Sequence, residues 1–337
     1  LSATIRMSSA AGRRSLAVNT AWGLGGRVFQ ALLQVFVTPV VIRLLGAEAY
    51  GVVAFSATLF AMVAVLDFAF GPVLQRTLNK ADTDVGHDAA ARARDLVFSM
   101  QSLSIALAIL VTAGIVVGSP WIAGHWLRAE NLAPATLALA VALIGVTIGL
   151  QWPGLLFGSG FTALERQDRL VQIRTALAAV QSLGGVLLLW LVAADPLLFL
   201  AWLAVVAALT TVTLGVVFWR LLPAVRPARW VPGRLKPHLH FSFGNLVIGL
   251  QAAILTQADK LIVVRFLGLQ SFAAYALAGF AAMTVISFAS APIVASILPR
   301  MTQRVAAADR AGLAAVMHRT AQQVALALLP AAATLAA

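Results

Sequence analysis

Long apolar runs recur along the whole chain and limit its fold more strongly than any other feature of the sequence. About 20 residues of helix cross the roughly 30 Å of hydrocarbon in a bilayer. With 61% hydrophobic and only 11% charged residues, the chain has too few charges to cover a water-exposed surface. The sequence therefore predicts an all-α, polytopic transmembrane helical bundle. We expect about nine membrane helices, at residues 16–38, 51–74, 95–117, 134–157, 170–193, 197–219, 241–264, 271–297 and 317–337.

Lysine and arginine are distributed unevenly over the predicted connections. If the N-terminus is cytoplasmic, 19 of the 24 basic residues fall on the cytoplasmic side, 4 fall on the opposite side, and Arg27 lies inside the first helix. Cytoplasmic loops of membrane proteins carry such an excess. We therefore expect a multi-pass membrane protein with its N-terminus in the cytoplasm. Topology also accounts for the net charge of +12, so no nucleic acid is expected as a partner.

The chain contains a parallel repeat. The sequence VIRLLG at 41–46 returns as VVRFLG at 263–268, each copy is followed by a tyrosine (Tyr50, Tyr275), and the offset stays between 220 and 225 residues. Such repeats build two-lobed transporters with a site between the lobes. The predicted parts are a cytoplasmic N-terminal segment (1–15), a first six-helix lobe (16–219), a basic cytoplasmic linker (220–240) and the first three helices of a second lobe (241–337). Because the second lobe would then stop early, we expect a truncated sequence that lacks at least three helices.

Polar residues follow one face of the first predicted helix. Arg27 lies about 16 Å along that helix, and a charge at this depth is costly. It belongs to a stripe with helical spacing, made of Thr20, Gly23, Arg27, Gln30, Gln34 and Thr38. A polar stripe in a membrane helix faces a water-filled cavity or other protein. The stripe as a whole favours a cavity, whereas Gln30 or Gln34 taken alone favours hydrogen bonds between helices.

Acidic residues in two predicted helices are candidates for ion coupling. Asp67 lies inside the second helix, where three roles are open: pairing with Arg27, binding a coupling cation, or reaching the membrane interface. The seventh helix carries Asn245, Gln251, Asp259 and Lys260. Asp259 and Lys260 are adjacent and near the outer end, so an interfacial role competes with a role in the cavity. Arg43 and Arg265, at matching sites of the repeat, are expected to anchor the outer boundary.

Other chemistries find little support in the sequence. Cysteine is absent, and the five histidines are scattered without a carboxylate cluster, so neither a metal site nor another cofactor is expected. No GxxxxGK[ST] sequence occurs, which argues against ATP hydrolysis by this chain. The longest predicted outer loop, about 118–133, has few polar groups that could act as catalysts. The sequence therefore predicts no enzymatic activity.

Short motifs in a consistent order connect the chain to a known family. Residues 19–80 contain Asn19 and Trp22, then Arg27, RLLG at 43–46, EAYG at 48–51, LDFAFG at 66–71 and Arg76. The second copy contains Asp259-Lys260, RFLG at 265–268 and Tyr275. This pattern resembles the polysaccharide-biosynthesis flippases (Wzx type) of the multidrug/oligosaccharidyl-lipid/polysaccharide exporter superfamily. It extends over essentially the whole chain.

The resemblance implies that the protein flips undecaprenyl-diphosphate-linked oligosaccharides across the inner membrane by alternating access, for O-antigen, capsule or exopolysaccharide synthesis. Besides this substrate and membrane lipids, it implies a polysaccharide polymerase and chain-length proteins as partners. The substrate would be bound by Arg27, Gln30, Gln34 and Asn245, with Asn19, Thr20, Gln251 and Lys260 as further candidates. Asp67 and Asp259 would couple transport to an ion gradient.

Three other functions stay open at this point. A flippase for lipid II would also use cavity arginines. A multidrug/cation antiporter of the same superfamily would favour an acidic cavity, whereas the deepest charge here is Arg27. A membrane-embedded polysaccharide ligase or polymerase would need a large outer loop with convergent catalytic residues.

Overall fold

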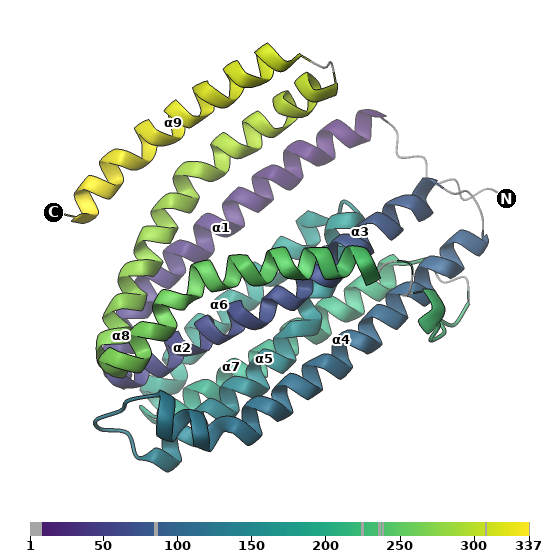
Figure 1. Ribbon diagram of the computed structural model, residues 1–337. Helices are drawn as coiled ribbons and strands as arrows, with labels where there is room; N and C mark the ends of the chain where they lie inside the picture. The colour runs from purple at the N-terminus through teal and green to yellow at the C-terminus, as the bar shows by residue number, and fades with distance from the viewer. Residues whose placement is uncertain are drawn as a thin grey trace. The chain divides into compact units, whose positions relative to one another are not determined.

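The computed structural model describes residues 9–83, 87–223, 226–234, 237, 239–306 and 309–336. Within these residues the chain forms nine α-helices and no strand, which confirms the all-α class (Figure 1). The helices are α1 (Ser9–Leu45), α2 (Ala47–Val63), α3 (Asp67–Thr83), α4 (His87–Trp121), α5 (Pro134–Ala163), α6 (Gln167–Leu191), α7 (Pro196–Leu221), α8 (Leu239–Ala306) and α9 (Arg310–Ala336). Three short helical turns accompany them, namely η1 (Ala64–Leu66), η2 (Ile122–Trp126) and η3 (Pro232–Arg234).

Six stretches of the described helices are long and apolar enough to cross a membrane. They are Val28–Leu45, Ala90–Trp126, Pro134–Ala163, Gln167–Leu191, Pro196–Leu221 and Ser242–Thr284. The last stretch is 43 residues long and holds two predicted spans, because non-helical backbone at Gly268 divides α8. A multi-pass membrane protein is therefore confirmed. The full count of nine spans stays a prediction.

The predicted span 51–74 is interrupted in the structure. Helix α2 is shorter than the other apolar helices, with 17 residues. The turn η1 follows it, and α3 begins at Asp67. Ala64 keeps helical backbone angles, with φ -59° and ψ -18°, so the interruption is a local 3-10 turn and not a gap in the helix.

Local sequence explains where several helices begin. Pro134 and Pro196 occupy the first positions of α5 and α7, where the missing proline N–H costs nothing. Asp195 caps α7 by accepting a hydrogen bond from the backbone N–H of Leu197 at 2.9 Å. Gly46, with φ 86°, separates α1 from α2, because a glycine adopts positive φ without a steric penalty.

The chain divides into two compact units, residues 1–273 and residues 274–337. Unit 1 contains α1 to α7 and the first part of α8, whereas unit 2 contains the rest of α8 together with α9. The lobe boundaries expected from the repeat, with a linker at 220–240, stay a prediction.

Helix α5 is the centre of unit 1 and packs against α3, α4 and α7. Small residues allow these helices to approach closely, as is typical of helix packing in membranes. A Cβ atom at Gly149 would lie 1.9 Å from Oγ1 of Thr112 on α4, and one at Gly160 would lie 2.4 Å from the Phe218 ring on α7. Phe218 is itself enclosed by Phe157 and Phe161. The glycines of α5 therefore set the distances between the helices.

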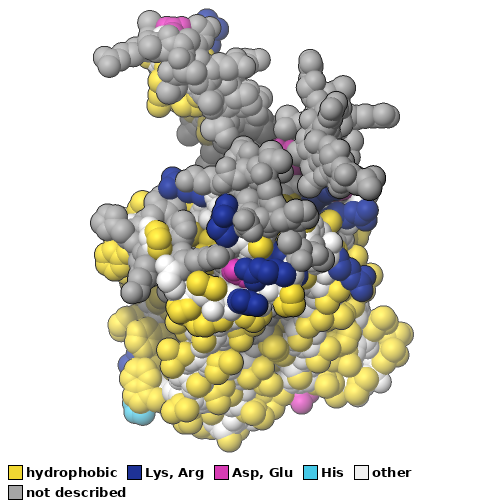
Figure 2. Space-filling model, turned by 90° about the vertical axis from the view of Figure 1, so that its right-hand side faces the viewer, with side chains coloured by type: hydrophobic (Ala, Val, Ile, Leu, Met, Phe, Trp, Pro, Cys, Tyr) yellow, Lys and Arg dark blue, Asp and Glu magenta, His cyan; other side chains and the backbone are white. Residues whose placement is uncertain are grey.

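The two ends of unit 1 differ in charge. At one end, here called the linker end, Leu78, Ala93, Phe161, Leu170 and Leu222 share one hydrophobic core. The opposite end is called the turn end here, and a second hydrophobic core there contains Val41, Leu189 and Phe199. In the view of Figure 2, most dark blue side chains lie in one band, and the described surface below that band is largely hydrophobic. The exposed arginines at the linker end are Arg76, Arg92, Arg166, Arg169, Arg220 and Arg229. This asymmetry agrees with the charge pattern of the sequence, and a cytoplasmic linker end stays a prediction.

The close approach at Gly160 leads to a stability prediction. Gly160→Ala should lower the free energy of unfolding by about 1–3 kcal/mol, because overpacking a rigid aromatic site forces a shift. The matched control is Gly114→Ala on α4, where the added Cβ meets no atom within 4 Å and alanine favours the helix. Thermal unfolding in detergent checks both variants. A Gly160→Ala protein as stable as the control would contradict the packing described above.

Candidate functional site

The α1 candidates lie along the contact between α1 and α6. A Cβ atom at Gly26 would lie 2.4 Å from Val171 and 2.9 Å from Oγ1 of Thr175. One turn further, Gln30 donates a hydrogen bond from Nε2 to Oγ1 of Thr175 at 3.2 Å. Gln34 is exposed, whereas Thr38 is buried. The residues of the stripe therefore have different surroundings. Gln30 makes a hydrogen bond between helices, which is one of the two roles considered for it, whereas Gln34 is exposed.

Four candidate side chains lie outside the part of the chain that the structure describes. These are Asn19, Thr20, Arg27 and Asp67. Their backbones belong to α1 and α3, and Arg27 directly follows the contact of Gly26 with α6. The roles predicted for these four side chains stay predictions.

The candidates on α8 have different surroundings. Asn245 is half-buried, and its Nδ2 is buried without a hydrogen-bond partner among the described residues. Gln251 and Asp259 are exposed. Lys260 donates from Nζ to the carbonyl oxygen of Thr256 at 3.1 Å and to Oε1 of Gln257 at 2.9 Å. Lys260 therefore bonds to its own helix, while Asn245 has an amide group available for a ligand.

Arg174 on α6 is half-buried and belongs to the 19 basic residues that the sequence predicts on the cytoplasmic side. It lies seven residues after the start of α6 at Gln167, a distance of about 10 Å along the helix. Its guanidinium group lies against α5, where Nη2 is 2.7 Å from the Cβ position of Gly158. The neighbouring residue, Thr175, bonds to Gln30. The sequence could have indicated this position, because Arg174 lies about two helical turns beyond the polar segment that precedes α6.

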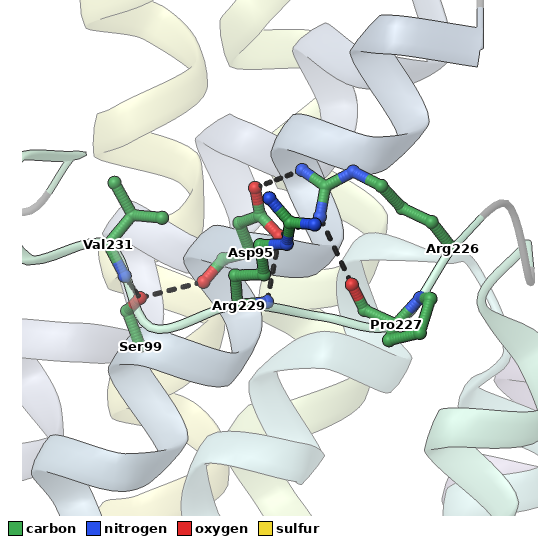
Figure 3. A network of polar contacts seen from close by, with 6 residues as sticks. All are labelled: Asp95, Ser99, Arg226, Pro227, Arg229 and Val231. Carbon is green, nitrogen blue, oxygen red and sulfur yellow. Dashed lines mark hydrogen bonds and ion pairs between the residues drawn. The ribbon is translucent and has the colours of Figure 1, made fainter.

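A polar network at the linker end, here called the clasp, holds part of the linker against α4 (Figure 3). Asp95 is only 1% exposed and forms an ion pair with Arg226. Its Oδ1 accepts from Nη1 of Arg226 and from the backbone N–H of Arg229, both at 2.9 Å. One turn along α4, Ser99 accepts from the backbone N–H of Val231 at 3.0 Å. The clasp therefore binds the backbone of residues 226–231 to one face of α4.

Arg94 extends the clasp toward the end of α7. Its Nη1 donates to the carbonyl oxygens of Leu222 at 3.2 Å and Pro223 at 3.1 Å. The guanidinium carbon lies 5.2 Å from the centre of the Trp219 ring, close enough for a cation–π interaction. These bonds satisfy carbonyl groups that the end of α7 leaves without helical partners.

Among the described residues, no group of three His, Cys, Asp or Glu side chains could hold a metal ion. The described polar side chains between α1, α5 and α6 include the amide of Gln30, the hydroxyl of Thr175 and the guanidinium of Arg174. Such groups donate hydrogen bonds to anions and to hydroxyl-rich ligands.

The apolar helices and the polar groups between them define a polytopic α-helical membrane protein. The family model for polysaccharide biosynthesis protein matches residues 16–305. The chain therefore belongs to the polysaccharide biosynthesis protein family, which confirms the resemblance seen in its motifs. No curated protein and no solved structure matches the chain.

The clasp predicts how the linker responds to mutation. Asp95→Asn should expose the linker, because Arg226 and the N–H of Arg229 lose a charged acceptor, at a cost of about 1–3 kcal/mol. Limited trypsin digestion in detergent should then cut faster after Arg229. Ser99→Ala should have a smaller effect in the same direction, since only the N–H of Val231 loses its partner.

The control for the clasp is Ser102→Ala on the same helix. Ser102 bonds to the carbonyl oxygen of Phe98 and does not contact the linker in any described bond. If trypsin cut the Asp95→Asn and Ser102→Ala proteins at equal rates, the clasp would not be what holds the linker.

Proposed function

We propose that the protein moves undecaprenyl-diphosphate-linked oligosaccharides from the cytoplasmic to the outer leaflet of the bacterial inner membrane. Transport follows alternating access and delivers sugar units for the synthesis of a surface polysaccharide. The linker end faces the cytoplasm, and no covalent chemistry is performed on the substrate. A polysaccharide polymerase and chain-length proteins act after it.

Membership of the polysaccharide biosynthesis protein family over residues 16–305 is the observation that carries this proposal. The long apolar helices support it, because a lipid-linked substrate must cross the bilayer while its polyprenyl tail stays in hydrocarbon. The excess of exposed arginines at the linker end supports the orientation, since cytoplasmic segments are rich in basic residues.

The chemistry of the substrate fits the polar groups available in the chain. A diphosphate needs cations and N–H donors, and arginine binds phosphate oxygens with two parallel hydrogen bonds. Arg27 is proposed to meet the diphosphate, and the position of Arg174 between α5 and α6 supports a second cation in the same region. Basic groups at this depth favour an anionic substrate over the cationic drugs of related exporters.

Asn245 is proposed to bond a sugar hydroxyl, together with the exposed Gln34. A buried N–H without a partner costs about 1–3 kcal/mol, and a ligand hydroxyl would supply the acceptor that Nδ2 of Asn245 lacks among the described residues. Gln30 already bonds to Thr175, so its proposed role in binding requires that bond to exchange for one to the substrate. Gln251 is proposed as a further contact for the sugar.

Backbone geometry supports the parallel repeat on which the two proposed lobes rest. The matched glycines of the repeat have nearly the same conformation, with φ 86° and ψ 160° at Gly46 and φ 81° and ψ 172° at Gly268. Each lies between two helical segments at the end of its motif. We infer that the two copies build equivalent turns in two lobes.

Arg27 offers the first test of this function. Arg27→Ala should reduce surface polysaccharide about 10- to 100-fold, because the diphosphate loses charge-assisted hydrogen bonds worth about 1.5–3 kcal/mol. Polysaccharide is measured on cells with matched levels of the protein in the membrane. Arg43→Ala, at a boundary position, serves as the control and should leave the polysaccharide near its normal amount. Unchanged polysaccharide in the Arg27→Ala cells would reject the binding role.

Asp67 offers the test of ion coupling. Asp67→Asn should remove the dependence of transport on an ion gradient, because the neutral amide no longer binds and releases the ion. Transport of a fluorescent lipid-linked oligosaccharide is measured in vesicles with and without an imposed gradient. The control is Asp309→Asn, which keeps the hydrogen bond to the N–H of Gly312 available. If both variants responded to the gradient alike, Asp67 would not be the coupling residue.

A further inference from the structure

The turn end of unit 1 brings the two copies of the repeat motif into direct contact. Gly51 lies so close to the turn at Gly268 that a Cβ atom there would be 2.2 Å from the carbonyl oxygen of Leu269. One turn further along each helix, the rings of Phe55 and Phe272 meet edge to face, with centroids 6.5 Å apart. Two segments more than 200 residues apart therefore close this end by backbone contact and aromatic packing.

A connection between α4 and α5, residues 127–133, binds to both of these segments. The carboxylate of Glu48 on α2 accepts backbone N–H bonds from Glu130 at 2.7 Å, Asn131 at 3.0 Å and Leu132 at 3.4 Å. It also accepts from Nδ2 of Asn131 at 2.7 Å. On the other side, the carbonyl oxygen of Arg128 accepts from the backbone N–H of Leu269 at 3.0 Å. One loop thus joins the first copy of the motif to the second.

Burial along the first part of α8 shows that the contact is tight only at the turn end. Val264, Leu269 and Phe272 are fully buried there. Toward the linker end the buried positions of the described segment are the small residues Gly249 and Ala253, while Leu255 is 83% exposed. The first part of α8 is therefore packed tightly at the turn end and has few buried side chains toward the linker end.

We propose that Glu48, the loop 127–133 and Leu269 form a latch that holds the turn end closed and must open when substrate is released to the outer side. The inference rests on the proposed transport function for its role and on the bonds above for its existence. Glu48 is the centre of the latch, because its carboxylate accepts charge-assisted bonds from three backbone N–H groups and one side-chain amide of the loop. An amide in its place presents an NH2 group to donors and cannot accept as many bonds.

The absence of cysteine from the chain makes a single introduced thiol a specific reporter of the latch. Ala273→Cys places that thiol next to Phe272 in the sequence, at a position that is 4% exposed. In purified protein without substrate, a membrane-impermeant maleimide should label it slowly. Adding Glu48→Gln should raise the labelling rate about tenfold, because the loop loses its charged acceptor.

The matched control for Glu48→Gln is Asp195→Asn, a carboxylate that caps α7 at the same end and accepts one described N–H bond. Asparagine is as good a cap as aspartate, so labelling should stay slow and unfolding temperature should stay normal. Equal labelling rates in the Glu48→Gln and Asp195→Asn proteins would overturn the latch.

A crosslink tests the role of the latch in transport separately. A Cβ atom at Gly268 lies 3.8 Å from Cβ of Arg128, within the range of a disulfide. Oxidation of the Arg128→Cys/Gly268→Cys protein should therefore form a bond that stops lipid transport, and reduction should restore it. Each single-cysteine protein controls for the strain of a side chain at the positive φ of residue 268. Continued transport through the crosslinked protein would overturn the gating role. If the unmodified protein moved no lipid while Glu48→Gln still sped up labelling, the proposed function would be rejected and the latch would stand.

Discussion

Hydrocarbon offers no hydrogen bonds to the backbone, and the rest of this structure follows from that constraint. Every N–H and C=O group inside a membrane must be satisfied by its own helix or by neighbouring protein. The chain accordingly places its irregular backbone at the helix ends, where side chains take over the bonding. Glu48 satisfies the N–H groups of the loop 127–133, and Arg94 satisfies the carbonyl groups after α7.

Each end of unit 1 uses a carboxylate to bind irregular backbone. At the linker end a buried carboxylate, Asp95, binds arginine and backbone from the linker, while exposed arginines surround it. At the turn end Glu48 binds a loop that also contacts Leu269. A transporter needs ends that hold firmly in one state and release in another. Charge-assisted bonds suit this, because a few of them control many apolar contacts.

The proposed function rests on the family and on the kind of polar group between the helices. The chain belongs to the polysaccharide biosynthesis protein family, and the described polar groups between its helices include the guanidinium of Arg174 and the amides of Gln30 and Asn245. Cations and amides match a diphosphate and a glycan. The proposed transport therefore needs few charges in the passage, with apolar helices providing a path for the polyprenyl tail.

The sequence by itself determined the all-α membrane fold and the family, because apolar runs of helical length and ordered motifs are local properties of the chain. The tertiary structure alone decided what each polar residue touches. Helical spacing placed Gln30 on a polar face, but only the packing of α6 gave it Thr175 as a partner. The charge pattern placed Arg174 on the cytoplasmic side, but only the packing of α6 against α5 brings its guanidinium group next to Gly158. The partners of Asp95 and Glu48 lie more than 80 residues away, and no local pattern encodes contacts over that distance.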